Sequence, residues 1–310
     1  MLEAITKRLE LDKRGISNII VVMLSLILIV IIVANVILCG YQMNQFDQER
    51  IQENMAITVV GDALFAHEEI TTIAAANYRT FRLVSADGEG TNFDVPETVG
   101  RHLCFRVLYP LAGISSIPAS TWTMYYRVQR YRTAAGLVTL PVCHADVDIL
   151  IRELNGTIRA NIATNVASSL NVAAGLDIWE TVNATYAWTA YTVVDQTDYL
   201  EVDFYIEVTT AGTRSAPRMR IDDPSLLAAD QTRVMLSSGI FTFKNKGSST
   251  SHLVGLWINN STNHQRYVID LFVNSGEEGT YIRGDINLPT ENFMVKVVTE
   301  RGNIAVFTNY

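Results

Sequence analysis

A long uncharged stretch near the start of the chain restricts the fold more than any other feature of the sequence. From Ile16 to Cys39 the sequence runs for 24 residues without a charged side chain and with only four polar ones. As a helix this stretch would be about 36 Å long, which is enough to cross a bilayer. A secretory signal has an apolar region of ~7–15 residues followed by small residues of the A-x-A type. No such site follows here, so the stretch predicts a retained apolar helix rather than a plain cleaved signal.

The charges around this stretch predict its orientation. Lys7, Arg8, Lys13 and Arg14 precede it, whereas the segment 40–45 behind it carries no charge. Because basic flanks stay on the cytoplasmic side, we expect residues 1–15 in the cytoplasm and the rest of the chain outside. The net charge of −8 disfavours a nucleic-acid partner, which rewards clustered Lys and Arg.

The helix is expected to continue beyond the apolar stretch, over residues 16–60. The segment 41–55 has no Gly or Pro, and Phe46, Ile51 and Met55 recur near helical spacing. The other faces of this segment are rich in Gln and Asn, so alone in water it would be marginal. We therefore interpret Phe46, Ile51 and Met55 as a face that packs on copies of the same helix.

Beyond the helix, apolar residues recur with a period of two, which is typical of strands with one buried face. Turn signals such as Ala86-Asp87-Gly88 and Leu154-Asn155-Gly156 separate the runs. This pattern predicts an antiparallel sandwich or jelly roll over residues 70–230. The clearest alternating sets are Val202, Phe204, Ile206 and Val208, and Ala145, Val147, Ile149 and Ile151.

A second β domain is expected over residues 231–310. Pro224 cannot continue a strand ladder, so the segment around it is interpreted as a linker. Four strand-like runs follow it, at 240–243, 253–258, 267–273 and 293–298. The predicted fold class is mainly β, with two antiparallel sandwich or jelly-roll domains on a hydrophobic helical stem.

The sequence Lys13-Arg14-Gly15 directly before the apolar helix resembles the class III signal peptides of archaeal type IV pilins and archaellins. The resemblance implies that a prepilin peptidase cuts after Gly15, that Ile16 becomes the new N-terminus, and that the helix stays on the mature chain. Ile20 stands where bacterial type IV pilins usually carry Glu, so the similarity is to the archaeal branch.

The two β regions are also similar to known domains. The C-terminal block, with Phe243-Lys-Asn-Lys-Gly247 and Lys296-Val-Val-Thr-Glu-Arg-Gly302, looks like the β domain of archaeal pilin-type surface proteins. The middle region, with Thr189-Ala-Tyr-Thr-Val-Val-Asp-Gln-Thr-Asp-Tyr199, resembles jelly-roll domains of archaeal surface proteins. These similarities imply display outside the cell.

Three cysteines occur in the chain. Cys39 ends the apolar stretch, where a thiol behaves as a small hydrophobe. An exterior location permits a disulfide between Cys104 and Cys143, which we predict, although two buried thiols would fit the sequence as well. Zinc binding by these cysteines with His102 and His144 is disfavoured, because the spacings match no common zinc motif and neighbouring strand residues point to opposite faces.

One loop gathers oxygen ligands that suit calcium. Two acidic residues at the far end of the same predicted domain complete the candidate set. Resemblance to jelly-roll carbohydrate-binding modules implies a structural ion near the ends of this domain. The spacing is not that of an EF-hand loop, and a solvated acidic turn accounts for the same residues. The candidate set is Asp87, Glu89, Asn92, Asp94, Asp222 and Asp223.

A strand-like segment carries aromatic residues on both faces. If Trp122, Met124, Tyr126 and Val128 face inward, the alternate residues face outward, and flat rings beside Arg could hold a sugar. Aromatic residues are also simply good strand formers. The candidate glycan-binding residues are Tyr125, Arg127 and Tyr131.

Four N-x-S/T sequons begin at Asn155, Asn183, Asn259 and Asn260. The expected exterior location makes glycosylation at them feasible. Turn-like surroundings favour Asn155 and the Asn259-Asn260 pair over Asn183.

No catalytic motif emerges, since the sequence has no nucleophile elbow, no phosphate loop and no H-E-x-x-H. We therefore expect a non-enzymatic structural subunit of an archaeal surface filament. It would polymerise with itself after leaving the membrane and display its β domains outward, with adhesion as a candidate role and no cofactor beyond the candidate calcium. The alternative is a monomeric membrane-anchored surface protein whose jelly roll binds glycans, and a membrane-anchored hydrolase ranks third.

Overall fold

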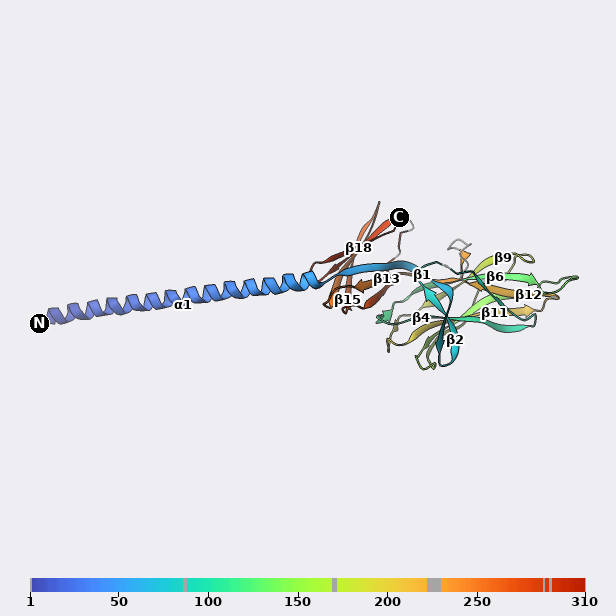
Figure 1. The fold of residues 1–310 in the computed structure, drawn as a ribbon, viewed down its shortest axis with the longest axis horizontal. Helices are drawn as coiled ribbons and strands as arrows, with labels where there is room; N and C mark the ends of the chain where they lie inside the picture. Colours follow the sequence, from blue (N-terminus) through green and yellow to red (C-terminus); the bar gives the residue numbers. More distant parts are fainter. Residues whose placement is uncertain are drawn as a thin grey trace.

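The computed structural model describes residues 2–309 apart from 86–87, 169–171, 222–229, 287 and 290–291, with side chains described from Ile20 onward. A single long helix, α1 (Leu2–Gln52), leads into a body built from β-strands. Figure 1 shows the helix extending away from that body, so that the N-terminus lies at the far end of the molecule. The predicted fold class, mainly β with a long N-terminal helix, is confirmed.

Over its described apolar part, from Ile20 to Leu38, helix α1 leaves its large side chains exposed. The large apolar side chains from Ile20 to Leu38 are 50–67% exposed. The described segment 20–52 is long and apolar enough to cross a membrane by length and composition.

The helix ends eight residues earlier than the expected boundary at 60. Strand β1 (Met55–Ile73) begins three residues after Gln52 and carries the β-branched run Ile57-Thr-Val-Val60 near its start. Such residues favour a strand over a helix when a partner strand is present, and β13 (Arg233–Asn245) is that partner. Met55 is therefore not part of a helical packing face. It is only 9% exposed in the core of the body, and its assignment to polymerisation is wrong.

The largest sheet is almost wholly antiparallel and runs in the order β3-β12-β6-β13-β1-β2-β4-β11-β7-β8, with β9 on β6 and β16 on β13. Strands β2 and β4 pair in parallel. A separate short sheet is formed by β5 (Ser116–Ile117) and β10 (Tyr191–Thr192). The remaining strands of the largest sheet are β2 (Ala76–Arg82), β3 (Thr91–Asp94), β4 (Gly100–Pro110), β6 (Ser120–Arg132), β7 (Val142–Arg152), β8 (Ile158–Ala167), β9 (Trp179–Trp188), β11 (Tyr199–Thr210), β12 (Ser215–Ile221) and β16 (Glu278–Arg283).

The predicted alternation places the larger hydrophobic core correctly. Trp122, Met124, Tyr126 and Val128 of β6 are fully buried. The same holds for the alternating apolar residues of β7 and β11, which keep one register from Tyr199 to Val208. Aromatic rings fill the centre: Phe105 stacks on Phe204 with centroids 4.8 Å apart.

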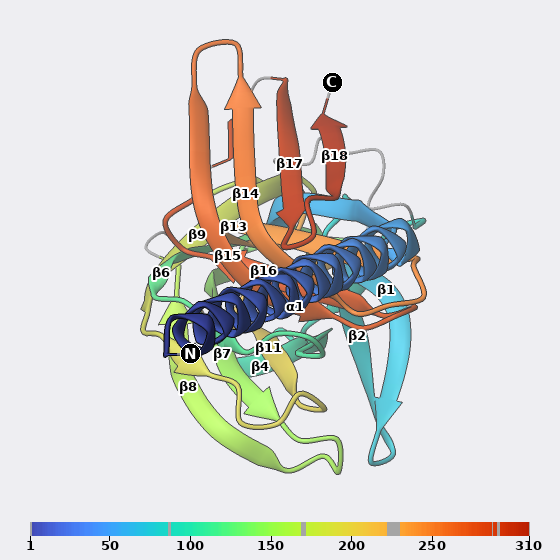
Figure 2. The same cartoon turned by 90° about the vertical axis from the view of Figure 1, so that its left-hand side faces the viewer.

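The C-terminal strands form a second sheet in the order β15-β14-β17-β18. Figure 2 shows these strands side by side, standing out from the end of the body that receives the helix. Their inner faces share a core with Met55 and Ile57 of β1 and with Phe241 and Phe243 of β13. The strands are β14 (Ser251–Asn260), β15 (His264–Val273), β17 (Phe293–Thr299) and β18 (Ile304–Asn309).

The two hydrophobic cores share strands, which the sequence did not predict. Strands β1 and β13 run through both cores, because Leu64 and Val234 lie in the larger core while Met55 and Phe243 lie in the smaller one. The expected boundary at 70 therefore falls inside β1, and the boundary at 231 assigns β13, which begins at Arg233, to the second domain alone although both cores use it. The larger sandwich is an insertion between β1 and β13, and Pro224 of the expected linker lies outside the described residues.

Candidate functional site

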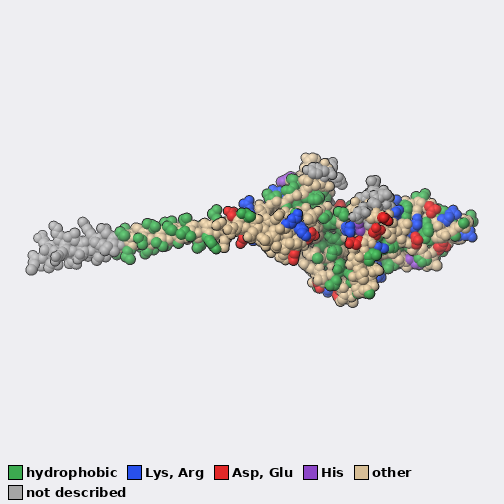
Figure 3. All heavy atoms as spheres, in the orientation of Figure 1, with side chains coloured by type: hydrophobic (Ala, Val, Ile, Leu, Met, Phe, Trp, Pro, Cys, Tyr) green, Lys and Arg blue, Asp and Glu red, His purple; other side chains and the backbone are tan. Residues whose placement is uncertain are grey.

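The described part of the stem presents an apolar surface from Ile20 to Leu38. Figure 3 shows hydrophobic side chains along its described length, in contrast to the mixed surface of the body. Beyond the apolar stretch, Phe46 and Ile51 remain exposed, Ile51 at 82%. Two of the three residues expected to contact other copies are thus free to do so.

A buried carboxylate joins the stem to the body. Glu53 follows the helix end and its side chain is fully buried. It accepts hydrogen bonds from Thr299 Oγ1 at 2.7 Å, Arg301 Nη1 at 2.8 Å and Asn303 Nδ2 at 2.9 Å. A buried carboxylate is stable only when donors surround it, so the turn from β17 to β18 is adapted to this helix end.

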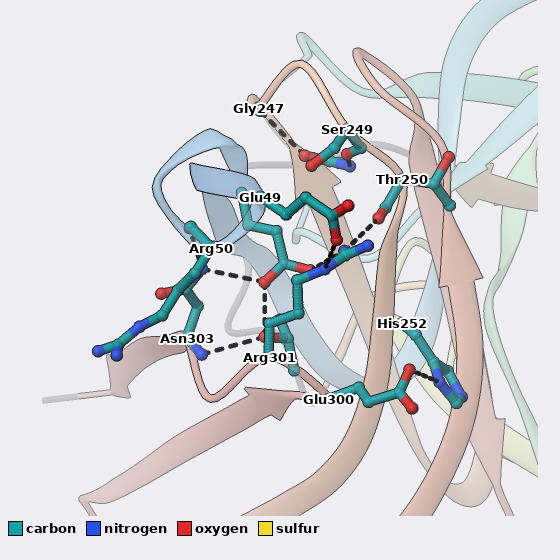
Figure 4. Close-up of polar contacts among 12 residues, drawn as sticks. Glu49, Arg50, Gly247, Ser249, Thr250, His252, Glu300, Arg301 and Asn303 are labelled. Carbon is teal, nitrogen blue, oxygen red and sulfur yellow. Dashed lines mark hydrogen bonds and ion pairs between the residues drawn. The ribbon is translucent and has the colours of Figure 1, made fainter. Parts of the chain in front are cut away.

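Arg301 and Asn303 extend the junction onto the helix itself (Figure 4). Arg301 Nε donates to Glu49 Oε2 at 3.1 Å, and Asn303 Nδ2 donates to the Arg50 carbonyl oxygen at 2.6 Å. The hydrogen bond that Arg301 donates to Glu53 raises the pKa of Arg301, and Glu49 adds to this effect. The C-terminal carbonyls of a helix need donors from outside the helix, and Asn303 supplies one.

A backbone loop completes the junction. The Lys246 and Ser248 amides donate to the Asn54 and Gln52 carbonyl oxygens at 2.7 and 3.0 Å. A Cβ atom on Gly247 would lie 2.2 Å from the Gln52 carbonyl oxygen, so only glycine permits this approach. The backbone contacts of this loop and the side-chain contacts of Glu53, Arg301 and Asn303 together fix the orientation of α1 relative to the second sheet.

The outer face of the second sheet is a further exposed apolar surface. Val268 and Phe272 of β15 and Ile304 and Val306 of β18 are exposed there. Basic side chains border it, since Arg266 and Lys296 lie over the Trp257 ring. Exposed apolar patches of this kind mark interaction surfaces more often than scattered residues do.

His252 lies on this same face. Its ring stacks on Phe272 with centroids 4.0 Å apart, and its Nδ1 and Nε2 lie 3.0 and 2.8 Å from Glu300 and Asp270 oxygens. The hydrogen bond to Glu300, followed by that to Asp270, raises the pKa of His252. These two contacts therefore stabilise the protonated form of His252.

The residues expected around the cleavage point, Lys13, Arg14, Gly15 and Ile16, lie within the backbone of α1. Their side chains are outside the described part of the structure. Cleavage there stays a prediction.

The predicted disulfide is wrong. Cys104 lies on β4 and Cys143 on β7, and β11 runs between these two strands. Two strand spacings amount to ~9–10 Å, which exceeds the ~7 Å that a disulfide allows between Cα atoms. Both residues are free cysteines. Burial raises the pKa of both thiols, that of Cys143 to about 11, so they remain protonated.

The candidate calcium ligands are only partly described. Asp87, Asp222 and Asp223 lie outside the described residues. Asn92 and Asp94 lie on β3 opposite Arg220 and Arg218 of β12, and the Glu89 amide donates to Glu68 Oε1 at 3.4 Å. A calcium site at this edge stays a prediction.

The candidate glycan-binding residues have partners within the chain. Arg233 lies over the Tyr125 ring at 3.9 Å and Arg218 over the Tyr131 ring at 4.5 Å. Arg127 Nη1 donates to Thr181 Oγ1 at 3.0 Å. One face of each tyrosine is thus covered by a guanidinium group, and these residues have a structural role that the sequence alone did not indicate.

The sequons differ in accessibility. Asn155 lies exposed in the turn between β7 and β8, and Asn183 is exposed on β9, whereas Asn259 and Asn260 are half-buried. Asn183 is therefore more exposed than Asn259 and Asn260, which does not support the expectation that it is the least favoured glycosylation site. Glycosylation itself stays a prediction.

A set of buried charges lies on the face of β4, β11 and β7 that the alternation assigns to solvent. Glu201 and Asp203 are buried there, and Arg152 Nη2 donates to Glu201 Oε1 at 2.9 Å. Burial, and then the nearby charge of Glu201, raises the pKa of Asp203. The hairpin of β1 and β2 covers this face through Ile73 and Tyr78, which pack with Leu108.

Comparison with known proteins gives no family. No protein-family model matches the chain, and no curated protein matches its sequence.

The structures with some likeness are distant. The subviral particle of infectious bursal disease virus VP2 is 10% identical over 48% of this chain and 34% of the viral chain, with a TM-score of 0.21. A GH2 beta-galacturonidase from Eisenbergiella tayi is 8% identical over 83% and 42% of the two chains, with a TM-score of 0.18. The baseplate tripod of bacteriophage Tuc2009 is 9% identical over 83% and 98%, with a TM-score of 0.19. This chain spans about a third of the viral chain, and similarity at this level carries no functional argument.

Proposed function

We propose that this protein is the structural subunit of an extracellular filament of the archaeal type IV pilus kind. It would be inserted in the cytoplasmic membrane first, processed after Gly15 and then assembled through α1. Its β body would be displayed outward, where it can serve in adhesion. The resemblance of Lys13-Arg14-Gly15 to class III signal peptides supports this proposal at the level of sequence.

The observation that carries the proposal is the combination of an exposed apolar stem with a specific junction to the body. The large apolar side chains from Ile20 to Leu38 are exposed in the described structure, so they require lipid or other copies of the stem. A simple anchor needs no defined direction. Here Glu53, Arg301 and Asn303 hold the stem in one orientation, which a repeating assembly requires.

Assembly would exchange lipid contacts for contacts between stems. Lipid already shields the apolar side chains, so close packing rather than the hydrophobic effect would drive association within the membrane. Removal of residues 1–15 would also remove the basic anchor at the cytoplasmic face. The exposed apolar face of the second sheet is a further surface on which neighbouring copies could pack.

The proposal is tested by expressing the full chain in an archaeal host that has a prepilin peptidase. Material sheared from the cell surface is sequenced from its N-terminus and viewed by electron microscopy. We expect filaments whose subunits start at Ile16. Subunits that start at Met1, or a protein that is recovered only as a detergent-extracted monomer, would contradict the proposal.

A pair of glycine variants sharpens the test. Gly15→Phe should block processing and leave the protein in the membrane, because the peptidase is expected to require a small residue before the cut. Gly40→Phe is the matched control, since a Cβ atom on Gly40 meets nothing within 4 Å. The control variant should be processed normally, and equal processing of both variants would rule out cleavage after Gly15.

One observation favours the alternative, a membrane-anchored monomer that binds glycans. A cavity of about 460 Å³ lies between β2, β3 and β4, lined by Tyr78, Arg79, Phe93 and Arg106 among others. Aromatic and guanidinium groups together suit a sugar ring. Retention on a glycan array that is lost in Phe93→Ala, combined with a protein that never forms filaments, would establish this alternative.

A further inference from the structure

Three side chains with metal-binding groups converge on the outer face of β7 and β11. Glu207 pairs directly with His144, and Asp146 lies two residues along β7 on the same face. His144 Nε2 is 3.1 Å from Glu207 Oε2. One ligand atom from each of the three residues lies within 4.8 Å of the other two.

Asp146 provides an independent indication of a missing ligand. Its side chain is fully buried, and Arg101 Nε and Nη2 both donate to the same oxygen, Oδ1. The other oxygen, Oδ2, is buried and has no hydrogen-bond partner among the described residues. A buried carboxylate oxygen without a donor or cation destabilises the fold, so something is expected to occupy the position that Oδ2 faces.

The local charges are not balanced. Asp146, Asp148 and Glu207 contribute three negative charges. Among the described residues Arg101 is the permanently charged cation paired with Asp146, and it also donates to Asp148 Oδ1 at 2.7 Å. With His144 neutral, as a metal ligand must be, these side chains carry a net charge of −2. A divalent cation would bring it to zero.

The geometry suits a small cation. Three atoms no more than 4.8 Å apart leave a point within about 2.8 Å of each, whereas Zn–N and Zn–O bonds are ~2.0–2.2 Å long. Side-chain shifts of less than ~1 Å would close this gap. Glu207 and His144 are partly exposed, so solvent and ions reach the site from outside.

We propose that His144, Asp146 and Glu207 form a binding site for a divalent transition-metal ion such as Zn²⁺. An imidazole nitrogen with two carboxylate oxygens selects such ions over Ca²⁺, which prefers oxygen alone. Arg101 is the outer partner that orients Asp146, an arrangement common around metal-bound carboxylates. The ion would tie β7 to β11 and brace the larger sandwich. The site shares His144 with the cysteine-containing zinc set that the spacing disfavoured, and it uses neither cysteine.

The test uses the full chain in detergent, stripped with EDTA and dialysed against Zn²⁺. We expect one tightly bound Zn²⁺ per chain, and a rise in melting temperature that grows with Zn²⁺ concentration, because a ligand of the native state stabilises it. His144→Gln and Glu207→Gln should each weaken Zn²⁺ binding at least tenfold while the circular dichroism spectrum stays unchanged. Absence of binding, or unchanged binding in both variants, would overturn the proposal.

His252 offers a matched control. It also contacts two carboxylates, Glu300 and Asp270, but through its two opposite ring nitrogens, so the three groups cannot converge on one ion. His252→Gln should leave Zn²⁺ binding unchanged. Loss of binding in this variant equal to that in His144→Gln would show adventitious surface binding and overturn the proposal.

Cobalt substitution distinguishes the ligand set. Co²⁺ bound by nitrogen and oxygen alone gives no thiolate charge-transfer absorption. A strong charge-transfer band would place Cys104 or Cys143 at the metal and overturn the assignment. Its absence, with d–d bands that disappear in Glu207→Gln, supports the proposed ligands.

Discussion

Glu53 is the residue through which stem and body are most directly connected. Its carboxylate accepts hydrogen bonds from Thr299, Arg301 and Asn303 and is fully buried. In Glu53→Gln the amide retains one acceptor oxygen but places an NH₂ group against these donors. We expect the free energy of unfolding to fall by about 1–3 kcal/mol, measured by denaturant titration of the full chain in detergent.

Glu49→Gln is the control for this prediction. Glu49 also binds Arg301, at 3.1 Å, but its side chain is about half exposed. Exposed pairs contribute ~0–1 kcal/mol, so this variant should differ little from the parent. An equal loss in the two variants would contradict a special role for the buried carboxylate.

His252 makes the outer face of the second sheet sensitive to pH. Its pKa is raised from the ordinary value of 6.5 by Glu300 and Asp270. The stabilisation is fully present below that ordinary value and is lost as pH rises through the raised folded-state pKa. The difference in melting temperature between the parent and His252→Ala should therefore shrink as pH is raised from 5 to 9. A difference that grows with pH would contradict the contacts with these two carboxylates.

At the scale of the elements, the end of α1 separates residues available to neighbouring copies from residues of the core. Ile51 is 82% exposed and Met55 is 9% exposed, although both follow the same apolar spacing. Ile51→Ala or Phe46→Ala should leave the free energy of unfolding within about 0.5 kcal/mol of the parent and reduce filament yield. Sheared-pilus assays and denaturant titration measure the two effects separately.

Met55→Ala is expected to have the opposite effect on the free energy of unfolding in the same experiment. It removes a side chain from the smaller core and should lower the free energy of unfolding by about 2–5 kcal/mol. If Met55→Ala leaves the free energy of unfolding unchanged, or if Ile51→Ala lowers it, the result would contradict a helix that ends at Gln52.

At the scale of the whole molecule, the shared strands predict one cooperative unfolding transition. Strands β1 and β13 contribute to both cores, so neither sandwich can lose them without exposing the other. Leu256→Ala in the smaller core and Val147→Ala in the larger core should lower the temperature of the same transition. Calorimetry tests this, since equal calorimetric and van't Hoff enthalpies indicate a two-state process. Two transitions, of which each variant shifts only one, would show independent domains.

Features set by nearby residues could be predicted from the sequence. A run of 24 residues without charge can satisfy its backbone only as a helix in an apolar environment. Alternation along β6, β7 and β11 correctly placed the inward residues of the larger core, because successive strand side chains point to opposite faces.

Features set by distant residues could not be predicted from the sequence. The helix ends at Gln52 because β1 pairs with β13, about 180 residues later. Cys104 and Cys143 remain apart because β11 lies between their strands. Glu201 and Asp203 are buried because the β1–β2 hairpin folds over a face that alternation alone assigns to solvent. The convergence of His144, Asp146 and Glu207 depends on the register of β7 and β11, and pairing between strands so far apart is decided by the packing of the whole body.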